Sequence, residues 1–132
     1  MNERAAQEQN IGYEVTRFGF DDVDRALAEG TDDGWIKVLT RPGKDEILGV
    51  TIVGPHAGEL IAEAVLAMTQ RLGLRKLMAT IHVYPTLMEA HKLAAGQWRK
   101  ARAPQRLLGY VAHLHAFLRG GGSPAVVEEV RR

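Results

Sequence analysis

Residues Thr80–Gly96 read TIHVYPTLMEAHKLAAG, and this stretch changes character at Pro85. The residues before the proline are rich in β-branched and aromatic side chains. Proline fits the first turn of a helix because the N–H that it lacks would have no intrahelical partner there. The sequence therefore predicts a helix that begins at Pro85, with Tyr84 at its entrance and Glu89 about one turn further along.

Tyr84 and Glu89 form the candidate functional pair of this stretch. They present a hydroxyl and a carboxylate beside a helix N-terminus, where the helix dipole favours negative charge. The same spacing is also an ordinary way to begin a helix, since Glu is common in first turns. A small hydrolase that uses His82 and Glu89 is a further alternative, but Thr80 and Thr86 complete no recognisable triad motif.

The composition is that of an ordinary globular domain. The chain has 132 residues, 45% of them hydrophobic and 25% charged, with a formal net charge of +1. A nucleic-acid-binding protein would usually carry a basic patch. The absence of cysteine excludes disulfides, thiol nucleophiles and zinc–thiolate sites. The polar N-terminus is not a signal peptide, and no apolar run approaches the roughly 20 residues that span a bilayer. We expect a cytoplasmic protein that binds neither nucleic acid nor membrane.

Residues 34–54 carry the clearest hairpin signal. Trp35–Thr40 and Ile47–Val53 both have strand composition, and Arg41–Asp45 between them supplies Pro and then Gly, as a type II turn requires. Gly49, inside the second strand, indicates a bulge or the close approach of another backbone. The glycines at 54 and 58 match no phosphate-binding pattern.

The rest of the chain predicts an α+β fold, with an antiparallel sheet, helices packed on one face and an extra C-terminal helix. The acidic segments DDVD and TDDG, and the histidines 113 and 115, predict no metal site. The expected elements are a strand in Ile11–Phe20, helical turns ending at Gly30, a helix at Glu59–Leu72 stopped by Gly73, a short turn at Leu74–Ala79, the helix from Thr86, and a final helix at Arg106–Arg119. The expected domains are 1–100 for the core, 101–119 for the C-terminal amphipathic helix and 120–132 for a flexible tail.

Four segments together resemble the C-terminal dimerisation domain of the FAD-dependent pyridine nucleotide-disulfide oxidoreductases, the family of lipoamide dehydrogenase, glutathione reductase and mercuric reductase. They are Gly34–Val38 (GWIKV), Ile47–Gly54 (ILGVTIVG), Ala57–Ile61 (AGELI) and His82–Ala90 (HVYPTLMEA). The resemblance covers about Met1–Gly96. It implies a reductase dimerisation fold, with FAD and NAD(P) as cofactors of a full-length enzyme and a homodimer as its assembly.

The same resemblance implies roles for three residues. In lipoamide dehydrogenase-like members a histidine precedes the proline, pairs with the glutamate that matches Glu89, and serves as acid–base for the partner's redox cysteines. Here Tyr84 stands at that position, as in mercuric reductases, and His82 matches an earlier, non-catalytic position. Tyr84 and Pro85 would face the partner's flavin, and Glu89 would orient a proton-handling group. A tyrosine with a pKa near 10 is a poor proton acceptor at neutral pH.

The chain carries neither the glycine fingerprints of FAD and NAD(P) domains nor redox cysteines. The resemblance also implies one more strand before Asn2, whose loss would leave an unpaired edge. We therefore expect an interface module of an oxidoreductase concerned with cell redox homeostasis, which is not catalytic alone. FAD- and NAD(P)-binding domains on another chain are possible partners. The alternative is an autonomous homodimer domain that has lost redox function.

Overall fold

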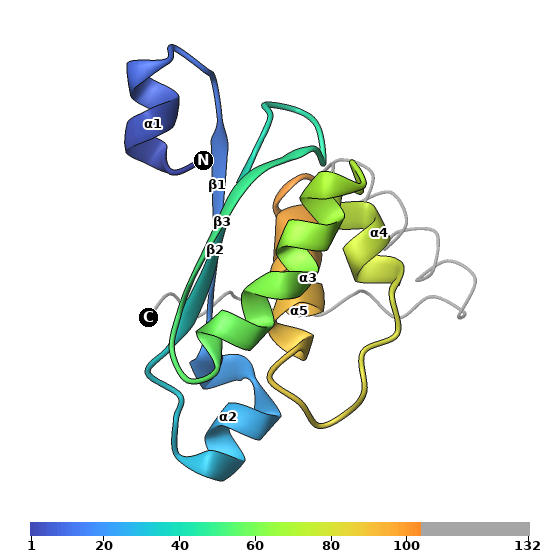
Figure 1. Cartoon of the computed structure of the whole chain (residues 1–132). Helices are drawn as coiled ribbons and strands as arrows, with labels where there is room; N and C mark the ends of the chain where they lie inside the picture. Colours follow the sequence, from blue (N-terminus) through green and yellow to red (C-terminus); the bar gives the residue numbers. More distant parts are fainter. Residues whose placement is uncertain (104–132) are drawn as a thin grey trace, which may run out of the picture. The chain divides into compact units, whose positions relative to one another are not determined.

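Three antiparallel strands in the order β1-β2-β3 form the sheet, namely Glu14–Gly19 (β1), Trp35–Thr40 (β2) and Ile47–Val53 (β3) (Figure 1). The structure is a computed structural model and describes residues 1–103. The helix predicted at Arg106–Arg119 and the tail predicted at 120–132 lie outside the described residues. The predicted hairpin of β2 and β3 is confirmed, because Gly43 takes a positive φ of 70° and the N–H of Lys44 bonds the carbonyl of Arg41 at 3.0 Å.

Helices α3, α4 and α5 lie on one face of the sheet, and α1 lies on the other (Figure 1). The predicted α+β fold is therefore confirmed, with one short helix added on the second face. The helices are α1 (Glu3–Glu8), a 3₁₀ turn (Phe20–Asp22), α2 (Asp24–Glu29), α3 (Ala57–Thr69), α4 (Leu74–Ala79) and α5 (Glu89–Ala101). Within the part of the chain that the structure describes, no helix has the length and apolarity needed to cross a membrane.

The core lies between the sheet and the three helices. Ile36 and Val38 alternate on β2 and are buried on the helix side, where they join Leu60 of α3 and Trp98 of α5 in one cluster. Burying an aliphatic or aromatic side chain of this size contributes about 1.5–3 kcal/mol. The small buried residues of α5, Ala90, Ala94 and Ala95, bring that helix close to β1 and β2.

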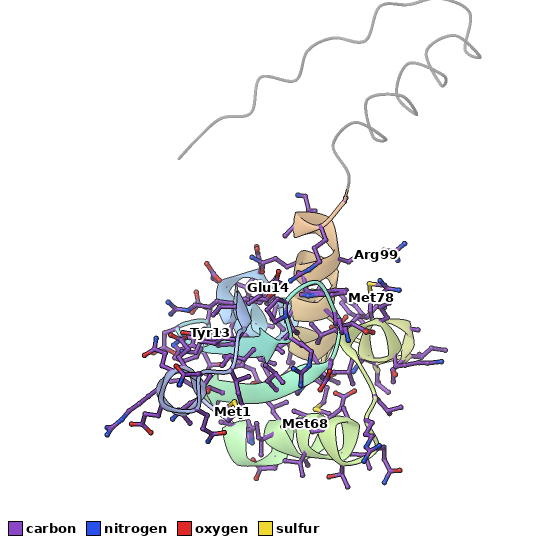
Figure 2. The ribbon with its side chains drawn as sticks, turned by 90° about the horizontal axis from the view of Figure 1, so that it is seen from above. Met1, Tyr13, Glu14, Met68, Met78 and Arg99 are labelled. Carbon is purple, nitrogen blue, oxygen red and sulfur yellow. The ribbon has the colours of Figure 1, made fainter. Side chains whose placement is uncertain are left out.

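Gly49 confirms the prediction of a bulge and of close backbone contact. The register of β2 and β3 shifts between Leu39 and Thr40, where β3 carries one residue more than β2. A Cβ atom on Gly49 would collide with the backbone of Met1, which lies beside the sheet (Figure 2). A side chain at residue 49 would therefore displace the start of the chain.

The predicted helix entrance at Pro85 was wrong. The Tyr84–Pro85 peptide bond is cis, residues 87–88 form a turn, and α5 begins at Glu89. The N–H of Thr86 bonds a carboxylate oxygen of Glu89 at 3.5 Å. The first residue of α5 therefore bonds the backbone of the turn that precedes the helix.

The predicted end of α3 at Leu72 was wrong by three residues. Helix α3 ends at Thr69, and Arg71 takes the left-handed conformation at φ 54° that was expected of a terminating glycine. Gly73 is needed for another reason, because a Cβ there would collide with Asp45. The carbonyl oxygen of Asp45 accepts the N–H of Leu74 at 2.9 Å, so the hairpin turn holds the start of α4.

Candidate functional site

Tyr84 lies on the loop between α4 and α5, and its side chain reaches across to α2. Its hydroxyl donates a hydrogen bond of 2.8 Å to Oδ2 of Asp24, which is 60 residues away in the sequence. The phenol is otherwise exposed to solvent. Asp24 begins α2, the short helix that the sequence predicted before Gly30. The loop and α2 are therefore joined through a phenol–carboxylate bond on the surface.

Glu89 lies near Tyr84, but the two side chains bond different groups. The carboxylate of Glu89 accepts the N–H of Thr86, while the hydroxyl of Tyr84 goes to Asp24. The Thr86 hydroxyl donates to the carbonyl oxygen of Val83 at 2.6 Å and so closes the loop on itself. The predicted Tyr84–Glu89 pair is thus a pair of neighbours, each held by its own partner.

The surroundings of Tyr84 raise its pKa above the ordinary value of 10.0. The hydrogen bond to Asp24 is the main cause, because it favours the protonated phenol, and the negative charges of Asp24 and Glu89 act in the same direction. At neutral pH Tyr84 is a neutral hydrogen-bond donor. It is therefore even less suited to accept a proton than its sequence position implied.

Pro85 lines a shallow hollow of about 380 Å³. The hollow lies between the loop, α2 and the start of α3, and residues of both signs border it. They are Arg25, Glu29, His56, Glu59, Leu60 and Pro85–Met88. An exposed Arg25–Glu29 ion pair closes one part of its rim. The hollow brings together two regions that lie far apart in the sequence, namely the acidic segment near Asp24 and the loop at Pro85.

Sequence reasoning missed Asp24 and Glu63 as partners of the site. Asp24 was interpreted as part of a solvated connection, and Glu63 as a charge near the positive end of its helix. In the structure Glu63 bonds His82, so His82 is directed to α3 and not to Glu89. The hydrolase alternative required His82 and Glu89 to work together. No local pattern indicates these contacts, because each joins segments at least 19 residues apart.

The raised pKa of Tyr84 leads to a testable prediction. Replacing Asp24→Asn removes the charge that opposes the phenolate, so Tyr84 should ionise at lower pH than in the parent chain. Tyrosinate absorbance measures this, with Tyr84→Phe identifying the contribution of Tyr84. Tyr13→Phe is the matched control, because the Tyr13 hydroxyl accepts a bond from Gln7 instead of donating one. An unchanged Tyr84 titration in Asp24→Asn would contradict the assignment.

The same bond makes the free energy of unfolding depend on pH. The folded state holds the phenol proton more tightly than the unfolded chain does. This contribution to stability is present below about pH 10 and is lost as the pH rises through the raised pKa. Asp24→Asn should reduce that loss in urea unfolding curves recorded above about pH 10.

An exposed apolar surface surrounds the site. It comprises Val65 and Leu66 on α3 with Ile81, Val83 and Tyr84 on the loop, and we refer to it as the α3–loop surface. Ile81 is 92% exposed, and Leu66 is 59% exposed. The loop is attached to α3 between Ile81 and Val83, because His82 bonds Glu63 of α3. Exposed apolar side chains that form a contiguous patch mark interaction sites.

Comparison with known proteins identifies the family. The model of the pyridine nucleotide-disulphide oxidoreductase dimerisation domain matches residues 1–95, which include the sheet, α3, the loop and the start of α5. The chain belongs to this family. The dimerisation domain is 44% identical over 92 residues to the dihydrolipoyl dehydrogenase of Trypanosoma brucei brucei. It is 39% identical over 89 residues to that of Chlamydia trachomatis.

The matches cover most of this chain and a small part of its relatives. They include 70% and 67% of the chain but 19% of each dehydrogenase, so the chain spans about a fifth of the length of these relatives. Solved structures share the fold. LpdA from Mycobacterium tuberculosis superposes with a TM-score of 0.68 at 23% identity, over 78% of this chain and 22% of LpdA. The HOCl-induced flavoprotein disulfide reductase RclA from Escherichia coli gives 0.67 at 20% identity, over 73% of this chain and 22% of RclA.

Proposed function

We propose that this dimerisation domain binds a second copy of itself through the α3–loop surface. The observation that carries the proposal is the exposure of four aliphatic side chains, Val65 and Leu66 on α3 with Ile81 and Val83 on the loop that His82 attaches to it. Each would contribute about 1.5–3 kcal/mol if it were fully buried by a partner. The chain belongs to a family of dimerisation domains, which supports self-association.

In a complete FAD- and NAD(P)-dependent oxidoreductase, the site would lie against the flavin of the partner subunit. Tyr84 and Pro85 would border the cofactor, and Glu89 would hold the start of α5 in place. Tyr84 would act as a neutral hydrogen-bond donor and not as a base, since its pKa is raised. Such an enzyme would take part in cytoplasmic redox homeostasis, with its flavin and nucleotide domains encoded on the same or on another chain.

The second candidate function is a self-associating module without redox chemistry. Tyr84 favours it, because the hydroxyl that stands at the acid–base position of the family is already committed to Asp24. The two functions predict the same homodimer and differ in the cofactor. An interface module should bind flavin only together with flavin- and nucleotide-binding domains, whereas an independent module should never bind it.

Sedimentation velocity of the purified chain, with absorbance read in the flavin band, tests the proposal. We expect a colourless dimer whose dissociation constant lies in the micromolar range or below, as expected for an interface with a buried apolar centre. A chain that stays monomeric at all concentrations would refute self-association. A yellow dimer with stoichiometric flavin would show that the domain binds the cofactor unaided. It would contradict the proposal that flavin binding needs other domains.

A further inference from the structure

The loop that carries Tyr84 runs from the end of α4 to the level of α2 before it turns into α5 (Figure 1). In residues 1–103, two pairs of hydrogen-bonded side chains join this loop to α2 and α3. One pair is Tyr84 with Asp24 of α2, and the other is His82 with Glu63 of α3. The two pairs differ in their exposure to water, so they differ in how firmly they can hold the loop.

The Tyr84–Asp24 bond lies on the surface. Tyr84 is 66% exposed, and Asp24 is exposed as well. Water competes for a phenol and a carboxylate in such a place, so a single bond between them contributes little. Fixing a loop costs conformational entropy at each of its residues. The bond is therefore too weak to order the loop by itself, and it forms because the loop already holds the hydroxyl over α2.

The His82–Glu63 bond is sheltered from water. The side chain of His82 is 4% exposed and that of Glu63 is 14% exposed. Nε2 of His82 lies 2.9 Å from one carboxylate oxygen and 3.1 Å from the other. Nε2 of His91 is 4.0 Å from the same carboxylate and donates to the carbonyl oxygen of Leu60 at 3.0 Å instead. Because a buried carboxylate without a partner is costly, Glu63 holds His82 in place.

The backbone carries this attachment from His82 to Tyr84. His82 lies two residues before Tyr84 in the sequence, so the position of one restricts the position of the other. The hydroxyl of Thr86 donates to the carbonyl oxygen of Val83 at 2.6 Å and closes the segment that contains Tyr84. The N–H of Thr86 also bonds Glu89, the first residue of α5. Tyr84 therefore lies on a short closed segment that is held at His82 on one side and at α5 on the other.

We propose that Glu63, acting through His82, is a positioning residue for Tyr84 and holds the loop where the hydroxyl reaches Asp24. The inference rests on the proposed function in one respect, since it makes Tyr84 a fixed hydrogen-bond donor of that site. Glu63 acts through geometry, because the negative charges that act on Tyr84 are those of Asp24 and Glu89. The charge of His82 is not required either, because a neutral imidazole with a proton on Nε2 still donates to the carboxylate.

The titration of Tyr84 reports its position, because the hydrogen bond to Asp24 is the main cause of its raised pKa. Carbon-13 NMR of tyrosine Cζ follows this titration in a Leu66→Glu background, which we expect to be monomeric, with Tyr84→Phe identifying the signal. Asp24→Ala removes the partner and defines the full fall of the titration midpoint. Glu63→Leu accepts no hydrogen bond and should produce about half of that fall or more. Glu63→Gln keeps an acceptor for His82 and should leave the midpoint unchanged.

A double-mutant cycle separates positioning from a general loss of stability. With Asp24→Ala in place, Tyr84 has no bond to lose, so Glu63→Leu should no longer move its midpoint. A midpoint that moves equally in both backgrounds, or in neither, would overturn the inference. Glu46→Leu is the matched control, because it removes a carboxylate from another ion pair, with Arg41 at 2.7 Å on the hairpin turn. A fall in Glu46→Leu as large as that in Glu63→Leu would also overturn it.

His82→Ala tests the same bond from its other side. Removing the ring admits water to Glu63, so the carboxylate is solvated and the variant should fold even if Glu63→Leu does not. The midpoint of Tyr84 should fall as it does in Glu63→Leu. Circular dichroism at the pH of the titration establishes that each variant is folded. An unchanged midpoint in folded His82→Ala would contradict the proposed role of Glu63.

The homodimer and the positioning role can fail separately. Sedimentation velocity of the parent chain decides self-association, whereas the titration of Tyr84 is measured in the Leu66→Glu background. A parent chain that stays monomeric, with a midpoint that falls in Glu63→Leu, would refute the homodimer and support the positioning role. A parent chain that dimerises, with a midpoint that ignores Glu63→Leu, would refute the positioning role and leave the homodimer standing.

Discussion

Leu66→Glu should convert the proposed homodimer into a monomer. Leu66 is an exposed residue of α3 in the proposed contact, so the two copies would bring two carboxylates into an apolar interface. An ionised group buried without a partner costs several kcal/mol, so the dissociation constant should rise by at least about 100-fold. Sedimentation velocity across a concentration series measures this change.

The same substitution should leave the fold of the single chain intact. Leu66 is more than half exposed in the isolated domain, so a charge there is solvated. Circular dichroism should be unchanged. Val15→Glu is the matched control, because it places the same charge on an exposed aliphatic residue of β1, on the sheet face that α1 occupies. A Leu66→Glu chain that remains dimeric, or a Val15→Glu chain that dissociates, would place the contact elsewhere.

The elements that could be predicted from the sequence are those defined by neighbouring residues. The Pro42-Gly43 turn fixes the hairpin because the type II turn needs a positive φ at its second central residue, and Gly43 has it. Gly30 ends α2 in the left-handed conformation, which likewise requires a positive φ. The apolar spacing of α3 predicts a broad buried stripe that includes Leu60, Ala64, Ala67 and Val65. The first three are buried, but Val65 is exposed.

The parts of the site that could not be predicted depend on distant contacts. The Tyr84–Asp24 bond links residues 60 apart, and the His82–Glu63 bond links residues 19 apart. Periodicity describes one element at a time and carries no information on which loop meets which helix. The resemblance identified the position of Tyr84 but not the carboxylate that raises its pKa. The proline was a strong local signal for the helix entrance, but α5 begins later, at Glu89.

Phe20→Ala should be among the most destabilising single substitutions in the domain. Phe20 is fully buried in the 3₁₀ turn after β1, and its N–H bonds the carbonyl of Gly34 at 2.8 Å. Its ring packs directly on Gly34 and Gly54, the two residues that flank the open end of the hairpin. Removing a buried phenyl ring costs about 3–5 kcal/mol. Small domains are stable by about 5–15 kcal/mol, so a large share of the total would be lost.

Urea unfolding measures this loss, and a double-mutant cycle tests its cause. A Cβ at Gly34 would meet the Phe20 ring and, at 2.7 Å, the carbonyl oxygen of Val53, so Gly34→Ala alone should destabilise the domain. In the Phe20→Ala background the ring is gone and only the contact with Val53 remains, so Gly34→Ala should cost less there by about 1 kcal/mol or more. Val53→Ala changes a half-exposed side chain at the end of β3. It should cost less than about 1 kcal/mol and serves as the control. Equal costs of Gly34→Ala in the two backgrounds would mean that the phenyl ring does not fill the space between the glycines at the open end of the hairpin.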